Sequence, residues 1–194
     1  MNYNVITISR QFGSGGRTVG KQVAASLQIP CYDQELIMKA AEESGLSSAY
    51  IAERGEYAAT GSWLANAFSD RNPNGESLQD YLWSVQRKVI LELAEKGPCV
   101  IVGRCADFIL RETPGCLRVY IHADLEKRAE RIVRVYGERD DSPMKRLRDK
   151  DKRRRAYYQY YTSLEWGDAN NYHISLDSGL FGIEKCSEII TALL

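Results

Sequence analysis

The chain has 194 residues, of which 44% are hydrophobic, and its 26 basic and 26 acidic side chains give a formal net charge of zero. This size suits one domain with a substantial core, and the neutral balance argues against general attraction to nucleic acid or to a membrane. Five cysteines without a C-x-x-C pair, no leader pattern and no apolar run of membrane-spanning length favour a cytoplasmic protein in a reducing compartment.

A glycine-rich segment follows the first predicted strand. The β-branched run at residues 5–8 predicts a buried strand, and Val19, Val23 and Leu27 share one face of a predicted helix. The turn between them consists of Gly13, Ser14, Gly15, Gly16, Arg17 and Thr18. Strand, glycine turn and helix is the geometry of a phosphate-binding loop, in which backbone N–H groups and a helix N-terminus face an anion. The alternative is a tight turn that binds nothing.

This segment departs from the pattern G-x-x-x-x-G-K-[ST] at two positions. Gln11 occupies the first glycine position and Arg17 occupies the lysine position. Arginine keeps the positive charge and can contact phosphate oxygens through two N–H groups at once. Thr18 places a hydroxyl where it would hold Mg²⁺. We therefore predict phosphate binding with Arg17 in place of lysine.

The next segment is a short predicted strand over residues 29–33 that ends in Asp33. This carboxylate can hold a magnesium-bound water or orient an acceptor, or it can cap the helix predicted over residues 34–44. The following stretch, residues 45–76, contains glycines and aromatic residues without clear periodicity. Insertions of this length are often functional.

The rest of the chain alternates helices with strands. The patterns predict helices beginning near residues 78, 107, 124, 143 and 183, and strands over 99–102, 117–121 and 172–176. Such alternation predicts a parallel sheet covered by helices on both faces, three layers in all. Ligands bind such sheets at the carboxyl ends of the strands. We therefore expect the glycine turn, Asp33 and Arg104 to lie close together.

Arg104 follows an apolar strand, where a guanidinium without a partner would be costly. An acceptor phosphate would provide the negative charge that it needs. A structural salt bridge with Asp107 or another carboxylate is the alternative. Both interpretations remain open from the sequence.

Positive charge is concentrated between Arg118 and Arg155, where fourteen basic and eight acidic residues give a net charge of +6. Eight of the basic residues lie in the predicted helix over 145–155. This helix could be a solvated face, a nucleic-acid-binding surface with neighbouring tyrosines for stacking, or a mobile lid that brings arginines onto a transferring phosphoryl group. The lid best suits a neighbouring phosphate-binding loop.

Five stretches carry a resemblance to a known family. They are S-R-Q-F-G-S-G-G-R at 9–17, Y-D-Q-E-L-I at 32–37, V-I-V-G-R-C-A-D at 100–107, D-K-R-R-R-A-Y-Y at 151–158, and the segment 166–172. With these motifs the chain resembles the cytidylate kinase-like family, a branch of the nucleoside monophosphate kinases. The resemblance implies a three-layer P-loop kinase fold over residues 1–194 as a single domain. It also implies an acceptor-binding insertion at 45–76 and an arginine-rich lid over 131–162.

The resemblance also implies roles for individual residues. The six residues of the glycine turn would hold the ATP phosphates, with Thr18 and Asp33 as the Mg²⁺ site. Asp33 and Arg104 would face the acceptor, and Arg17, Arg131 and Arg154 would act on the transferring group. The implied activity is ATP- and Mg²⁺-dependent phosphoryl transfer to a nucleoside monophosphate, with CMP or dCMP as the best candidate. The implied partners are small-molecule nucleotides rather than nucleic acid or membrane.

Two other functions remain open from the sequence. One is a kinase whose acceptor is the hydroxyl group of another small molecule, which would require a base, and Asp33 is the candidate. The other is a nucleotide-binding sensor without catalysis, suggested by the departures at Gln11 and Arg17.

Overall fold

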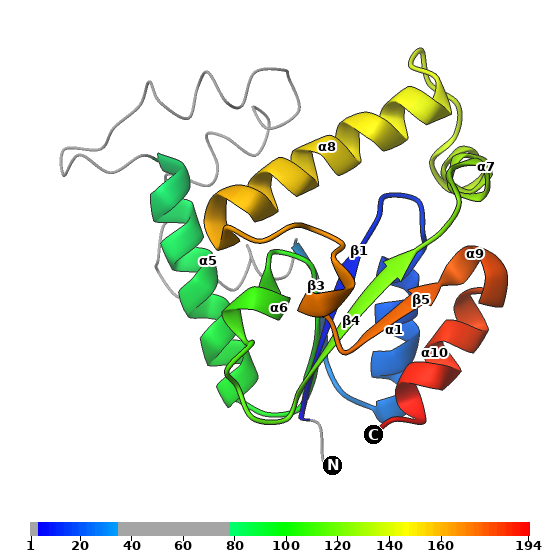
Figure 1. Cartoon of the computed structure of the whole chain (residues 1–194). Helices are drawn as coiled ribbons and strands as arrows, with labels where there is room; N and C mark the ends of the chain where they lie inside the picture. The colour runs from blue at the N-terminus through cyan, green and yellow to red at the C-terminus, as the bar shows by residue number, and fades with distance from the viewer. Residues whose placement is uncertain (1–3, 35–77) are drawn as a thin grey trace.

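The computed structural model describes residues 4–34 and 78–194. Within them, parallel strands form one sheet in the order β2-β3-β1-β4-β5 (Figure 1). The strands are β1 (Val5–Arg10), β2 (Cys31–Tyr32), β3 (Cys99–Val102), β4 (Cys116–His122) and β5 (Ile174–Asp177). The predicted α/β class with a parallel sheet is therefore confirmed.

Helices cover both faces of this sheet. They are α1 (Gly16–Leu27), α5 (Leu78–Glu95), α6 (Ala106–Ile109), α7 (Leu125–Tyr136), α8 (Pro143–Thr162), α9 (Ser178–Phe181) and α10 (Ile183–Thr191), with a short 3₁₀ helix at Ala169–Asn171. Figure 1 shows α1 and α10 on one face and α5 and α6 on the other. Helix α8 crosses above the carboxyl ends of the strands, beside α7, and lies over the edge where the predicted site residues emerge.

Alternating side chains of the inner strands explain the two cores. Ile6 and Ile8 of β1 pack with Val19 and Val23 of α1 in one apolar cluster, while Val5 belongs to the cluster under α5. Successive side chains of a strand point to opposite faces. A strand buried on both faces is therefore mostly apolar, and in this run of β1 the one polar residue, Thr7, has its hydroxyl 3.5 Å from the Leu117 carbonyl oxygen.

The element boundaries differ from the sequence prediction at several points. Strand β1 continues to Arg10, the short helix after β3 begins at Ala106, and β5 begins at Ile174. Helix α9 and the 3₁₀ helix were not predicted, because a helix of three or four residues leaves no periodic pattern. The predicted helix beyond Gln34 and the insertion at 45–76 lie outside the described residues.

Helix α8 starts at residue 143, where the sequence predicted a helix to begin. Pro143 is its first residue, and the Ser142 hydroxyl accepts a hydrogen bond from the Lys145 backbone N–H at 3.4 Å. Proline suits the first helical position because its missing N–H would have no partner there. In the described part of the chain, no helix is both long and apolar enough to cross a membrane.

Candidate functional site

The glycine-rich loop between β1 and α1 adopts a backbone that requires glycine. Gly13 and Gly15 have φ angles of 81° and 82°, in a region that side chains rarely enter. A Cβ atom at Gly15 would lie 2.6 Å from a methyl carbon of Ile183, and one at Gly16 would lie 2.5 Å from the Cβ atom of Arg10. This is the kind of tight turn in which successive backbone N–H groups can face an anion.

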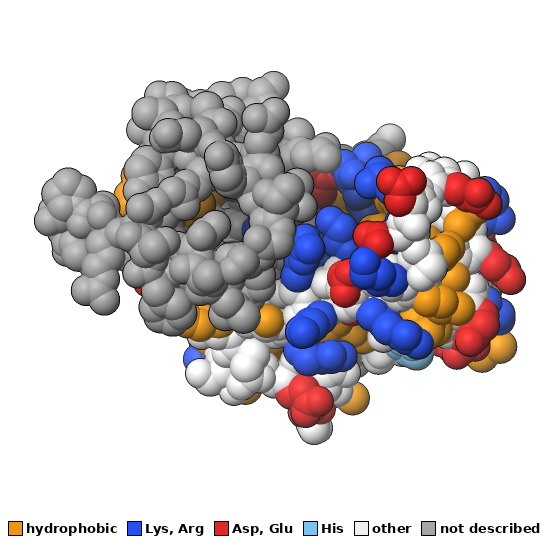
Figure 2. Space-filling model, turned by 90° about the horizontal axis from the view of Figure 1, so that it is seen from above, with side chains coloured by type: hydrophobic (Ala, Val, Ile, Leu, Met, Phe, Trp, Pro, Cys, Tyr) orange, Lys and Arg blue, Asp and Glu red, His pale blue; other side chains and the backbone are white. Residues whose placement is uncertain are grey.

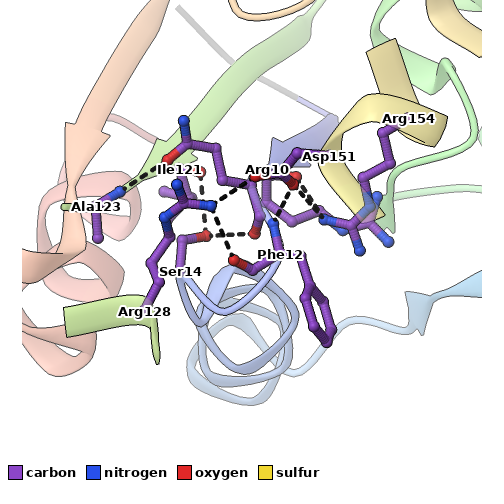
Figure 3. A network of polar contacts seen from close by, with 9 residues as sticks. Arg10, Phe12, Ser14, Ile121, Ala123, Arg128, Asp151 and Arg154 are labelled. Carbon is purple, nitrogen blue, oxygen red and sulfur yellow. Dashed lines mark hydrogen bonds and ion pairs between the residues drawn. The ribbon is translucent and has the colours of Figure 1, made fainter. Parts of the chain in front are cut away.

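Polar contacts fix this loop to the end of β4 (Figure 3). The Ser14 hydroxyl lies 2.9 Å from the Gln11 carbonyl oxygen and 3.1 Å from that of Ile121. The Gln11 side-chain oxygen accepts a hydrogen bond from the Ala123 N–H at 3.2 Å. The glutamine at the first glycine position therefore has a structural task that glycine could not perform.

Arg17 and Asp33 form an ion pair across the start of α1 and the end of β2. Nε and Nη2 of Arg17 lie 2.7 and 2.6 Å from Oδ2 of Asp33. The aspartate side chain is only 8% exposed, whereas that of the arginine is 46% exposed. The structure thus brings together two residues predicted from separate motifs. Arg17 leans toward the β2 side of the loop.

Arg131 of α7 reaches the other side of the loop, where its Nη2 donates a hydrogen bond to the Thr18 hydroxyl at 3.0 Å. Thr18 and Asp33 offer the hydroxyl and carboxylate oxygens that Mg²⁺ prefers. The described residues contain no cluster of three or more His, Cys, Asp or Glu that could hold a metal. This donor set fits Mg²⁺, because that ion usually takes one or two protein ligands and completes its shell with phosphates and water.

The turn after β3 presents Arg104 in a strained backbone. Gly103, Arg104 and Cys105 have φ angles of 80°, 58° and 53° in succession. A residue other than glycine in this region costs about 1–2 kcal/mol, and such strain gathers at functional sites. The Arg104 guanidinium carbon lies 5.9 Å from the centre of the Tyr157 ring. Arg104 therefore lies at the carboxyl end of the sheet, under α8.

Asp107 is not the partner of Arg104. Its carboxylate accepts hydrogen bonds from the Ser9 hydroxyl at 3.0 Å and from the Tyr158 hydroxyl at 2.7 Å. Burial raises the pKa of Asp107, and the hydrogen bonds from Tyr158 and Ser9 oppose that rise. The structure thus excludes the proposed salt bridge between Arg104 and Asp107. It assigns Asp107 to a buried network that ties α8 to β1.

A second ion pair fastens α7 and α8 to the glycine loop (Figure 3). Nη1 of Arg128 lies 2.6 Å from Asp151 Oδ2 and 3.2 Å from the Phe12 carbonyl oxygen. Asp151 Oδ1 accepts a hydrogen bond from the Phe12 N–H at 2.8 Å. A Cβ atom at Gly13 would lie 2.9 Å from the Arg128 carbonyl oxygen. We call Arg128, Asp151 and the Phe12 backbone the α7–α8 seam.

Arg154, a predicted lid arginine, lies next to this seam. Its Nη1 donates a hydrogen bond to the Arg10 carbonyl oxygen at 2.8 Å, and its guanidinium carbon lies 5.6 Å from the centre of the Phe12 ring. Burial lowers the pKa of Arg154, and the charge of Asp151 opposes that effect. The sequence prediction missed the roles of Asp151 and Arg10. Two features of the sequence could have indicated these roles. Asp151 is an acid within a basic helix, and Arg10 is a cation just after an apolar strand.

A cavity of about 340 Å³ opens beside the loop. Its lining includes Gly13, Lys127, Arg131, Arg134, Ser178 and Ile183. Seen from above the strand ends, Lys and Arg side chains gather on this face of the molecule (Figure 2). The volume lies in the range of small-molecule sites. The lining carries three basic side chains, Lys127, Arg131 and Arg134, against the two acidic ones of Glu130 and Glu184, a small positive excess.

Comparison with known sequences identifies related proteins. Residues 5–180 match the model of the cytidylate kinase-like family. The chain is 30% identical over 190 residues to a cytidylate kinase of Archaeoglobus fulgidus, covering 95% of this chain and 91% of that protein. It is 27% identical over 175 residues to a cytidylate kinase of Methanosarcina barkeri, with coverages of 89% and 86%.

Solved structures give the same picture of the fold. An uncharacterized protein from Eubacterium ventriosum superposes with a TM-score of 0.74 at 26% identity, covering 97% of this chain and 96% of that one. A shikimate kinase from Acinetobacter baumannii, solved with shikimate, superposes with a TM-score of 0.54 at 17% identity, with coverages of 98% and 92%. The second likeness concerns the fold alone.

Proposed function

Because this chain belongs to the cytidylate kinase-like family and has the fold of a P-loop kinase, we propose that it transfers the γ-phosphoryl group of ATP to a nucleoside monophosphate. The proposed acceptor is CMP or dCMP. The observation that carries the proposal is the position of Arg17, Arg104, Arg131 and Arg154 around one glycine loop. They come from α1, the turn after β3, α7 and α8.

The donor nucleotide would occupy the loop and the cavity beside it. Backbone N–H groups of Gly13 to Thr18 would bind its phosphates, and the nucleoside would enter the cavity between α7 and the segment after β5. Thr18 and Asp33 would hold Mg²⁺, which when bound supplies positive charge to the phosphates. Arg131 already contacts Thr18, so it is close to the position proposed for the ion.

The acceptor would lie on the β2–β3 side of the loop, where Asp33 and Arg104 emerge. The phosphate of a nucleoside monophosphate is already anionic, so its attack needs no dedicated base. Catalysis then rests on positioning and on neutralising negative charge in the transition state. Arginine suits both tasks because its planar fork can bind two oxygens of one phosphate.

The proposed organisation is a single domain over residues 1–194. Its acceptor-binding insertion would be residues 45–76, which lie outside the described residues, and its lid would be residues 131–162. The lid would include most of α8 and the end of α7. Closure over the nucleotides would exclude water and so suppress hydrolysis of ATP.

The experiment that tests the proposal measures ADP release from ATP and Mg²⁺ with CMP, dCMP, UMP, AMP, GMP and dTMP as separate acceptors. Shikimate and gluconate serve as hydroxyl acceptors in parallel. We expect acceptor-dependent ADP release with CMP or dCMP. Release with a hydroxyl acceptor alone would overturn the assignment. Binding of ATP without release by any acceptor would favour the nucleotide sensor.

A variant tests the loop assignment within the same assay. We expect Arg17→Ala to lower kcat by about 100-fold or more, the scale found when one charge-stabilising donor is lost. The matched control is Lys96→Met, which removes one exposed cation that precedes β3 and therefore lies at the opposite end of the sheet. Turnover near that of the unaltered protein in Arg17→Ala would contradict the role given to Arg17.

A further inference from the structure

Arg10, the last residue of β1, extends its side chain across the strand ends. Its Cβ and Cγ atoms pack against Gly16, where an added Cβ would lie 2.5 and 3.0 Å from them. Its guanidinium lies against Gly103, where an added Cβ would overlap Nη1 and lie 2.7 Å from Cζ. The Arg10 side chain therefore spans the distance from the glycine loop to the turn that carries Arg104.

The surroundings of Arg10 confine its side chain to a narrow path. Glycine at 16 and 103 leaves the space that the side chain fills, and the φ angle of 80° at Gly103 shapes that space. The Arg10 carbonyl oxygen accepts a hydrogen bond from Arg154 at 2.8 Å, so the backbone here is held as well. A side chain held this firmly loses little conformational entropy when it binds a ligand.

The charge of Arg10 is not balanced locally. Among residues 4–34 and 78–194, no carboxylate lies within ion-pair distance of Arg10 or Arg104. Burial lowers the pKa of Arg10 to about 9, and the charges of Arg154, Arg104 and Arg17 act in the same direction, whereas Asp33 opposes them. Arg10 still carries its proton at neutral pH. A partly buried cation among like charges would be stabilised by an anion.

We propose that Arg10 and Arg104 together bind the phosphate group of the acceptor, Arg10 from the end of β1 and Arg104 from the turn after β3. This rests on the proposed function in one respect, that the acceptor carries a phosphate. The chemical class recognised is a phosphate monoester. Arg10 is then a substrate-binding residue that lies between the donor loop and the acceptor.

The neighbouring arginines already contact other groups of the protein. Arg10 and Arg104 differ, because no carboxylate of the described residues pairs with either. Nε and Nη2 of Arg17 contact Asp33, and Nη1 of Arg154 contacts the Arg10 carbonyl oxygen. Arg131 donates to Thr18 on the opposite side of the loop. The Arg10 guanidinium lies beside Gly103, the residue directly before Arg104, and the charge of Arg104 lies close enough to act on the pKa of Arg10. Two guanidinium forks suit the several oxygens of a phosphate.

The first test measures equilibrium binding without turnover. Inorganic phosphate is titrated by calorimetry into the protein with ADP in excess, so that the glycine loop is filled by the nucleotide. The proteins compared are the unaltered chain, Arg10→Met, Arg10→Lys and Arg104→Met. The matched control is Lys96→Met, which removes one exposed cation at the opposite end of the sheet.

We expect Arg10→Met and Arg104→Met each to weaken phosphate binding about 10- to 100-fold, the range for one or two charge-assisted hydrogen bonds. Arg10→Lys keeps the charge but not the fork, so we expect an intermediate loss. Lys96→Met should bind as the unaltered chain does. Phosphate affinity that falls in Arg104→Met but not in Arg10→Met or Arg10→Lys would overturn the proposal.

Two further readouts separate binding from packing. In the ligand-free protein, Arg10→Met should keep or raise the melting temperature, because a cation among like charges is removed. A clear fall in melting temperature with unchanged phosphate affinity in Arg10→Lys would mean that Arg10 only fills space.

With an active acceptor, Arg10→Met should raise the KM of the acceptor more than that of ATP. If no monophosphate is a substrate, loss of phosphate binding in Arg10→Met would still support the site.

Discussion

Arg128, in the α7–α8 seam, has different surroundings from Arg10 and Arg104. Arg10 ends β1, and Arg104 lies in the turn after β3. Arg128 is 7% exposed and contacts the carboxylate of Asp151 at 2.6 Å. Arg10 and Arg104 are partly buried, and no carboxylate of the described residues pairs with either. Arg128 contacts the Phe12 carbonyl oxygen, and Arg10 packs against Gly16 of the glycine loop.

This difference separates two uses of one residue type. A buried cation with a matched anion holds elements of the fold together, and its removal leaves the anion unpaired. A cation without such a partner stores an unfavourable charge that a ligand can neutralise. In this protein the first kind joins α7 and α8 to the loop, and we propose that the second kind binds phosphate.

The largest expected effect comes from removing the Arg128–Asp151 ion pair of the α7–α8 seam. Arg128→Met should lower the free energy of unfolding by about 3–5 kcal/mol, the range for removing one partner of a buried ion pair. The carboxylate of Asp151 would remain buried without its cation. Urea unfolding followed by circular dichroism measures the change. Arg10→Met, a loss of one arginine from the other group, is the matched comparison and should not lower stability.

A double variant sharpens this prediction. Arg128→Met combined with Asp151→Leu removes both charges, so it should recover part of the lost stability. A loss of under about 1 kcal/mol in the single variant would contradict the description of the seam as a buried structural pair.

The sequence predicted the fold well because its signals are local. The β-branched run of β1, the glycine turn and the N-cap Ser142 with Pro143 each fixed an element from a few neighbouring residues. Because parallel strands end at the same edge of a sheet, the sequence also predicted that Asp33 and Arg104 lie at one edge. The ion pair between Arg17 and Asp33 joins two motifs that the sequence treated separately.

The charge partners could not be predicted, because pairing depends on contacts between distant parts of the chain. Arg128 and Arg131 are one helical turn apart, yet one pairs with Asp151 and the other contacts Thr18. Arg10 lies two residues beyond the predicted strand, and the direction of its side chain became clear only from its contact with Gly103. Local patterns do not carry this information.

The next largest effect concerns the space that holds Arg10. Gly103→Ala should lower the free energy of unfolding by about 2 kcal/mol or more, because the left-handed backbone and the overlap with the Arg10 guanidinium both oppose the methyl group. The control is Gly137→Ala, which has a φ angle of 73° and no heavy atom within 4 Å of an added Cβ. Equal losses in the two variants would mean that Arg10 moves aside without cost.

A smaller effect concerns Asp107, a buried carboxylate held by hydroxyls instead of arginine. Because burial raises its pKa in the folded protein, folding favours the protonated form. Its contribution to stability therefore falls as the pH rises from about 4, the unfolded pKa, to the raised folded pKa, by at most about 1.4 kcal/mol per pH unit. Asp107→Asn should lack this fall. Unfolding free energies of both proteins from pH 4 to 8 measure it, and parallel curves would contradict it.

The smallest expected effect tests whether the first turn of α8 acts independently of the middle of that helix, which holds Asp151 and Arg154. Ser142→Ala removes an exposed N-cap with a hydrogen bond of 3.4 Å, so it should lower the free energy of unfolding by only about 0.5–1 kcal/mol. Asp151 and Arg154 lie more than two helical turns further along and are held by their own contacts with Phe12 and Arg10. Fraying of the first turn should leave those contacts intact, so kcat/KM for ATP should stay unchanged. A fall of tenfold or more in kcat/KM would mean that the seam depends on the whole helix. The arginines at the strand ends would then no longer be separable from it.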